Sequence, residues 1–331
     1  MRHVQIDAES AGQRLDKLLG QLLLGVPRSH IFRLIRRGEV RVNGGRAGPE
    51  RRLALGDSVR LPPVREQAPA VPGRVPPTLL QVVERAIIHE DPRLLVLDKP
   101  AGLAVHGGSG LSFGVIEALR ASRPQETLEL AHRLDRDTSG CLMVARRGSA
   151  LRALHALLRE GLVQKSYLTL VAGRWSSGQK NIDAPLRTDL RVGGERTVKV
   201  DARGKAAVTE FKLIEHYGQN ASLLEARLHT GRTHQIRVHA AYCGHPVLGD
   251  AKYGSEAGNA ELSALGLDRM FLHAHSLAFA WPDGAEESFS APLPPELRAV
   301  LDRLSGGSKP PARRRTPGAA RAQGTRRAQG S

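Results

Sequence analysis

The sequence contains few aromatic residues and only two cysteines. Phe, Trp and Tyr make up 4% of the 331 residues, and Cys141 and Cys243 each lie in an apolar stretch. Such cysteines are more often small core residues than disulfide partners, which fits a reducing cytoplasm. No run of about eighteen apolar residues occurs, so we expect no membrane-spanning segment. Residues 1–16 also lack the apolar stretch typical of a signal peptide.

Acidic residues are outnumbered: the chain has 49 Lys and Arg against 33 Asp and Glu, a formal net charge of +16. Residues 12–62 hold eleven basic and four acidic residues, and residues 306–331 hold seven basic and no acidic residues. This concentration of positive charge predicts a polyanionic partner. A genome that favours arginine is an alternative explanation of the second cluster, but it explains the first cluster less well.

The first basic cluster falls in a segment with regular periodicity. Leucines at helical spacing over residues 15–23 predict a helix that Gly25 ends, and apolar residues at 31–35 predict the inner face of a second helix. Pro27 is placed to open this second helix. A strand at 40–42, an Asn43-Gly44 hairpin-type turn and a strand at 59–61 are predicted to follow it.

This layout over residues 13–62 resembles the αL RNA-binding module first known from a small-subunit ribosomal protein. The resemblance implies that basic side chains of this module hold RNA phosphates and position the RNA. The residues expected to do so are Arg14, Lys17, Arg28, Arg33, Arg36, Arg37 and Arg41.

The rest of the chain divides by composition. Residues 63–80 are rich in Pro and Ala without periodicity and predict a linker, and the Gly-, Pro- and Arg-rich residues from 306 onward predict a disordered tail. Between them, the sequence predicts strands at 94–97, 167–171, 208–214 and 223–228, and helices at 149–159 and 233–243 with Thr233 as N-cap and Gly244 as stop.

The segment His132–Gly140, HRLDRDTSG, is a polar loop between an apolar lead-in and an apolar strand at 141–145. Asp135 alone would most often be a residue that caps neighbouring backbone N–H groups. The complete string, however, resembles the catalytic loop of the RluA-type pseudouridine synthases of large-subunit ribosomal RNA. The resemblance implies that Asp135 attacks the target nucleoside, as a nucleophile or as a stabiliser of an oxocarbenium ion. Asp137 is assigned to holding the loop.

Three further segments are similar to motifs of the same family. In KSYLTLVAG (165–173) the resemblance makes Tyr167 the ring that stacks on the base, and in LHTGRTHQIRVH (228–239) it makes Arg237 the partner of Asp135. In FLHAHSLAF (271–279) it places Leu272 under the flipped base. Outside this context these residues would be an ordinary strand residue, a solvated charge and a core residue. The residues expected to shape the loop are His132, Arg133 and Thr138.

Two patterns resemble ligand sites but are rejected. His229, His234 and His239 recur at a spacing of five, which does not place them on one helical face, and no carboxylate or thiolate set accompanies them. The glycine-rich residues 107–110 lack the Lys-Ser/Thr ending of a phosphate-binding loop. We therefore expect no metal. We expect no cofactor either, because the reaction that the resemblance implies, the isomerisation of uridine to pseudouridine, is redox-neutral.

The resemblance covers residues 12 to about 304 and implies an α+β fold. A catalytic domain over 81–305, with a mixed, mainly antiparallel sheet and flanking helices, would follow an RNA-binding domain (1–62) and the linker (63–80), with a basic tail over 306–331. The motif sequences most resemble those of the C-type branch of this synthase family, whose expected substrate is 23S ribosomal RNA or a large-subunit precursor. We expect a cytoplasmic monomer. The alternatives are the same chemistry on transfer RNA or another ribosomal site, or a non-catalytic RNA-binding assembly factor.

Overall fold

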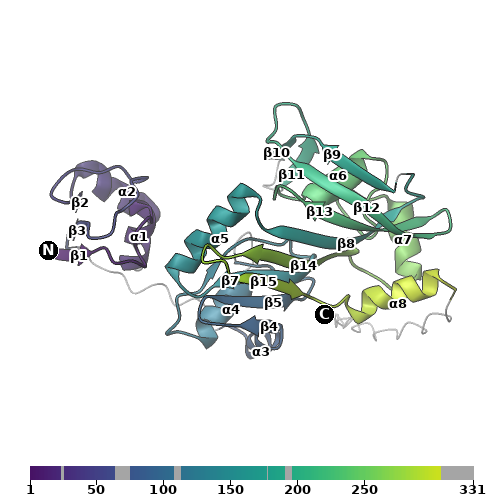
Figure 1. The fold of residues 1–331 in the computed structure, drawn as a ribbon, viewed down its shortest axis with the longest axis horizontal. Helices are drawn as coiled ribbons and strands as arrows, with labels where there is room; N and C mark the ends of the chain where they lie inside the picture. Colours follow the sequence, from purple (N-terminus) through teal and green to yellow (C-terminus); the bar gives the residue numbers. More distant parts are fainter. Residues whose placement is uncertain (24–25, 64–74, 108–112, 177, 191–195, 307–331) are drawn as a thin grey trace, which may run out of the picture.

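The computed structural model describes residues 1–23, 26–63, 75–107, 113–176, 178–190 and 196–306. Figure 1 shows a small N-terminal unit beside a larger unit that is built around a broad sheet. Most of the predicted linker, the glycine-rich residues 108–110 and the predicted tail from 307 onward lie outside the described residues.

The N-terminal unit packs two helices on a three-stranded sheet. Its strands run in the order β1-β3-β2, and Leu15, Leu19 and Val59 are fully buried between helices and sheet. Asn43 and Gly44 adopt positive φ values of 52° and 77°, so the predicted turn is confirmed. Strand β1 was not predicted. The bounds are β1 (Arg2–Gln5), α1 (Leu15–Leu22), α2 (Arg28–Arg37), β2 (Arg41–Val42) and β3 (Ser58–Leu61).

The larger unit is built on a ten-stranded sheet in its described residues. The main path runs β4-β5-β7-β14-β8-β13-β12-β9, with β15 paired to β14 and β6 paired to β7. The β7–β14 pair is parallel and the other pairs are antiparallel, so the predicted fold class is confirmed. The strands are β4 (Ile87–Glu90), β5 (Leu94–Lys99), β6 (Glu129–Leu130), β7 (Ser139–Ala145), β8 (Gln164–Ala172), β9 (Gln179–Asp183), β12 (Val208–Tyr217), β13 (Ala221–Leu228), β14 (Leu272–Ala280) and β15 (Glu286–Ser290).

Helices cover both faces of the sheet around β5 and β7. Leu95 and Leu97 of β5 pack into the core that contains α4, whereas Leu94 and Val96 pack into the core that contains α5. Because successive strand residues point to opposite faces, both faces are buried here, which explains why residues 94–97 read as one apolar run. The helices are α3 (Pro77–Arg85), α4 (Val115–Ser122) and α5 (Gly148–Glu160).

A second set of elements surrounds the other half of the sheet. Helix α6 contacts β11 and β12, and helices α7 and α8 contribute Leu262 and Leu297 to a core around Phe271. The bounds are β10 (Leu186–Leu190), β11 (Arg196–Val200), α6 (Gln235–Tyr242), α7 (Glu256–Ala264) and α8 (Pro295–Leu304). No helix in the described part of the chain is long and apolar enough to cross a membrane.

Two predicted boundaries are wrong. The last residues assigned to the linker are helical, because α3 begins at Pro77 and Leu79 and Leu80 pack against the core. Thr233 is not the N-cap of α6, because this helix begins at Gln235. Its N-cap is His234 in the left-handed conformation, and the Gln235 side chain accepts the Arg232 N–H at 3.0 Å instead.

The two units meet through polar contacts at the start of α5. The carboxylate of Glu9 accepts hydrogen bonds from the backbone N–H and the hydroxyl of Ser149, both at 2.8 Å. The guanidinium of Arg152 donates to the carbonyls of Ala8 and Glu9. A carboxylate at a helix N-terminus is favourable because it meets unpaired N–H groups and the positive end of the helix dipole.

Candidate active site

The polar loop predicted at 132–140 lies between β6 and β7 and is held by hydrogen bonds within the loop and from Lys99. The Thr138 N–H donates to the Asp135 carbonyl at 3.2 Å. The fully buried Lys99 ammonium donates to the Arg136 carbonyl at 3.0 Å. Gly140 has a φ of 107°, and a Cβ there would collide with the Ala274 carbonyl of the parallel strand β14. The glycine of the motif therefore permits the close approach of β7 and β14 that brings the loop beside Leu272.

Asp135 is held by an arginine from helix α6. Nη1 of Arg237 donates to Oδ2 of Asp135 at 3.1 Å, a contact between residues 102 positions apart. The same guanidinium donates from Nε and Nη2 to the two oxygens of Asp250, at 2.7 and 2.8 Å. Burial opposes the charged form of Arg237, but the bonds to Asp250 and the charges of both carboxylates raise its pKa overall. Arg237 is thus a fixed cation that orients Asp135.

Two aromatic side chains surround this ion pair. His234 Nε2 lies 3.8 Å from Asp135 Oδ2, and its Nδ1 lies 2.8 Å from the Tyr253 hydroxyl. That hydroxyl accepts the Val198 N–H, so its own hydrogen can be donated to Nδ1. Burial lowers the pKa of His234 although Asp135 opposes the shift, which favours a neutral ring. The guanidinium of Arg237 also lies over the Tyr253 ring, 5.1 Å from its centroid.

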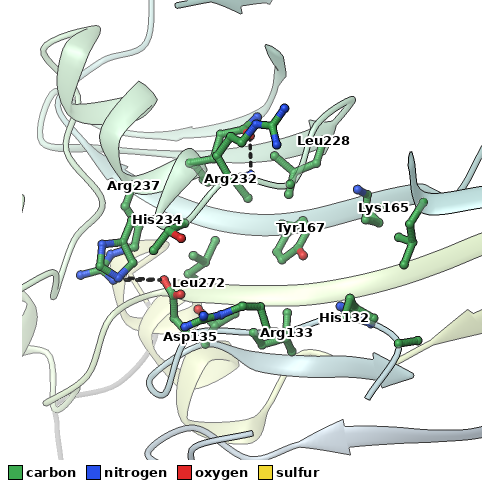
Figure 2. A pocket seen from close by; sticks show the side chains of 18 of the residues that line it. His132, Arg133, Asp135, Lys165, Tyr167, Leu228, Arg232, His234, Arg237 and Leu272 are labelled. Carbon is green, nitrogen blue, oxygen red and sulfur yellow. Dashed lines mark hydrogen bonds and ion pairs between the residues drawn. The ribbon is translucent and has the colours of Figure 1, made fainter. Parts of the chain in front are cut away.

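Asp135 opens into a cavity of about 370 Å³. Figure 2 shows Asp135 and Arg237 at one end, Tyr167 and Leu272 along the middle, and Lys165 and His132 at the other end. Tyr167 is 7% exposed, and burial together with the charge of Asp135 raises its pKa, so the phenol is protonated at neutral pH. A carboxylate, a buried ring and an apolar floor on one cavity suit an extruded nucleobase and its sugar.

Sequence comparisons match both units of the chain to known families. Residues 93–242 match the family described as RNA pseudouridylate synthase, and residues 13–59 match the S4 domain. A Haemophilus ducreyi protein described as ribosomal large subunit pseudouridine synthase C is 52% identical over 303 residues, covering 90% of this chain and 94% of the relative. A protein of Escherichia coli K12 with the same description is 50% identical over 307 residues, 91% of this chain and 96% of the relative. The chain belongs to the RNA pseudouridine synthase family.

Solved structures support the same family. The human RNA pseudouridylate synthase domain containing 1 is 26% identical, with a TM-score of 0.55 over 68% of this chain and 96% of its own length. The human RNA pseudouridylate synthase domain containing 4 is also 26% identical, with a TM-score of 0.56 over 69% of this chain. The family resemblance drawn from the motifs is confirmed.

The residues expected to shape the synthase loop differ in exposure. His132 accepts the Met143 N–H at Nε2, and burial and the charge of Lys165 lower its pKa to about 4, so the ring is neutral at pH 7. Thr138 is 2% exposed and lines the cavity, whereas Arg133 lines the cavity from an exposed position. All three lie on the same loop as Asp135.

The basic residues of the S4 domain are mostly on its surface. Arg28, Arg33, Arg36 and Arg37 are exposed on α2, opposite the face that packs Leu34. The others assigned to RNA are Lys17, which is exposed, Arg41, which donates to the Gly44 carbonyl, and Arg14, which is half-buried. Arg14 departs from the expectation of a free phosphate ligand, because Asp16 accepts two hydrogen bonds from its guanidinium at 3.0 Å each.

Sequence reasoning missed four residues of the site. Asp250 and Tyr253, in the segment GDAKYG, hold Arg237 and His234, and the fully buried Lys99 holds the loop. Lys165 shares the KSY motif with Tyr167, and its two-residue spacing on a strand was the signal that it faces the same cavity. The described residues contain no group of three or more His, Cys, Asp or Glu arranged to hold a metal.

Proposed function

We propose that this synthase converts uridine to pseudouridine in large-subunit ribosomal RNA, with Asp135 as its nucleophile. The proposal is carried by one observation: the carboxylate of Asp135 is held by Arg237 at the end of a cavity lined by Tyr167. The substrate is supported by identity of about 50% along most of the chain to proteins named for the large ribosomal subunit.

Each residue then has a distinct task. Asp135 acts at the anomeric carbon, by forming a sugar ester or by stabilising the oxocarbenium character that precedes elimination. Arg237 keeps the carboxylate ionised and aimed. Tyr167 stacks on the uracil, and its protonated hydroxyl is available for proton transfer. Leu272 supports the flipped base, and Arg133, His132 and Thr138 shape the loop.

The S4 domain supplies the RNA affinity that the cavity alone does not provide. Exposed arginines of α2 hold phosphates without reading sequence, while the cavity accepts a uridine from a loop or strained helix that extrudes at low cost. Residues 1–62 form the RNA-binding domain in this proposal, the catalytic domain extends from helix α3, which begins at Pro77, to residue 305, and residues 306–331 are a basic tail. We further propose that the protein acts as a monomer in the cytoplasm.

Pseudouridine mapping on protein-free 23S ribosomal RNA tests this function. We expect site-specific product with the wild type, none with Asp135→Asn, and wild-type product with Glu286→Gln, an exposed carboxylate on β15. Formation of pseudouridine on transfer RNA instead of ribosomal RNA would overturn the proposed substrate. No product on either RNA, together with Asp135→Asn cells that keep normal ribosome assembly, would support a non-catalytic assembly factor.

A further inference from the structure

Lys165 is a buried cation that the roles described above do not use. It precedes Tyr167 by two residues on β8, so both side chains point to the same face of the strand and line the cavity. The residue is 9% exposed, and burial lowers the pKa of its ammonium with no other contribution. Within the part of the chain that the structure describes, this ammonium has no hydrogen-bond or ion-pair partner.

The surroundings of Lys165 do not explain why a charge is placed there. The cavity is also lined by Leu158, Leu228 and Arg159, and His132, whose ring is neutral at pH 7, lies at the same end as Lys165. The ammonium opens into the cavity, because Nζ is not among the fully enclosed side-chain nitrogens that lack a partner. A charge that is largely desolvated and has no protein acceptor is unfavourable, and a ligand in the cavity can supply the acceptor. The cavity therefore lacks one anionic or carbonyl oxygen at this position, which a bound substrate can provide.

The position of Lys165 along the cavity indicates which oxygen that is. Asp135 lies at the opposite end and Tyr167 between them (Figure 2). Same-face residues on a strand are about 6.7 Å apart, so Lys165 lies one step beyond the ring on which the base stacks. A sugar at Asp135 and a base on Tyr167 direct the far edge of the base toward the ammonium.

The reaction places negative charge on that edge. When the C1′–N1 bond breaks, its electron pair leaves with the uracil and is shared among N1 and the two carbonyl oxygens. Rejoining forms the C1′–C5 bond, the hydrogen of C5 leaves as a proton, and N1 gains a proton, so atoms and charge balance. In the ester path the bond between Asp135 and C1′ breaks as the C1′–C5 bond forms, and in the elimination path the proton removed from C2′ returns to C2′.

We propose that the Lys165 ammonium hydrogen-bonds to a carbonyl oxygen of the target uracil and stabilises the detached uracil anion. This inference rests on the proposed function and assigns a further catalytic residue to the same cavity. A cation placed where negative charge develops acts mainly on the transition state, so it contributes to the rate more than to binding.

Lys165→Met tests the role, because it keeps the stem and removes the charge. On an RNA that the wild type modifies, we expect the single-turnover rate to fall about 100-fold, the size typical for loss of one preorganised donor. The RNA dissociation constant and its salt dependence should stay at wild-type values. The matched control is Lys212→Met, an exposed lysine on β12, which should leave rate and binding unchanged.

Two further measurements separate this role from others. Replacing the target uridine by 4-thiouridine weakens one carbonyl acceptor, so this change should slow the wild type more than Lys165→Met. The variant should also be at least as stable as the wild type, because removal of an unpaired buried charge leaves no unsatisfied partner. A loss of thermal stability would indicate a structural role and overturn the proposal.

The remaining outcomes are also decisive. A wild-type rate in Lys165→Met would overturn the role of Lys165 and leave the proposed function intact. Weaker binding with a salt slope reduced by about one and an unchanged rate would identify a phosphate contact instead. Absence of product from the wild type itself would count against the proposed function rather than against Lys165 alone.

Discussion

Asp250 offers a test of how Asp135, the proposed nucleophile, is positioned, because it touches Arg237 rather than the cavity around Tyr167. Its side chain is fully buried, and it accepts two hydrogen bonds from Arg237 and one each from the N–H groups of Lys252 and Tyr253. The bonds to Arg237 and its charge outweigh burial and lower the pKa of Asp250, so it is ionised at neutral pH. Asp250→Asn keeps the shape but removes the charge and replaces one acceptor oxygen by an amide donor.

The expected loss follows from the bonds that asparagine cannot make. At least one charge-assisted hydrogen bond is lost, which is worth about 1.5–3 kcal/mol. If Arg237 then aims Asp135 less firmly, the single-turnover rate falls about 10- to 100-fold. The unfolding free energy should fall by about the same 1.5–3 kcal/mol in urea titrations. A folded Asp250→Asn protein with the rate of the wild type and of Glu286→Gln would refute the claim that Asp250 positions the site through Arg237.

Three further predictions concern the loop, the core and the tail. Gly140→Ala should lower the unfolding free energy by much more than Gly218→Ala does. Gly218 also has a positive φ but has open space around it, so Gly218→Ala should lower the unfolding free energy by only about 1 kcal/mol. Equal losses of stability for the two variants in thermal melts would contradict this. Burial lowers the pKa of His273 to about 4, so the unfolded state binds more protons between pH 6.5 and 4 and stability falls as pH drops through that window. Between pH 6.5 and 5 this loss is about 2 kcal/mol, and His273→Gln should show a correspondingly smaller pH slope in denaturant titrations. Deleting residues 306–331, which carry seven basic residues, should weaken RNA binding and flatten its salt dependence. An unchanged dependence of the binding constant on salt would show that the tail does not contact RNA.

The elements of the fold could be predicted where periodicity and burial agree. Residues 94–97 are apolar at every position because β5 is covered on both faces, and the leucines of 15–23 lie on one face of α1. Local pattern failed where tertiary packing decides. Residues 77–80 look like part of a proline-rich linker, yet Leu79 and Leu80 gain enough burial against the core to form the first turns of α3.

The site was predictable only through motif resemblance. Nothing local joins Asp135 to Arg237 across 102 residues, and the resemblance supplied that pairing. Asp250 was missed because an aspartate after a glycine is typical of an exposed turn, and burial is not visible in sequence. Lys165 was missed for a related reason, since a lysine at the start of a strand is usually a surface charge.

A comparison of the two aspartates of the loop tests the central claim most directly. Asp135 and Asp137 share the loop, but only Asp135 bonds to Arg237 and lines the cavity with Tyr167, whereas the Asp137 side chain is exposed. In single-turnover assays on 23S ribosomal RNA, Asp135→Asn should yield no pseudouridine, while Asp137→Asn should form it within about tenfold of the wild-type rate. Product from Asp135→Asn at the wild-type rate, or its loss from Asp137→Asn alone, would contradict the assignment of Asp135 as the nucleophile.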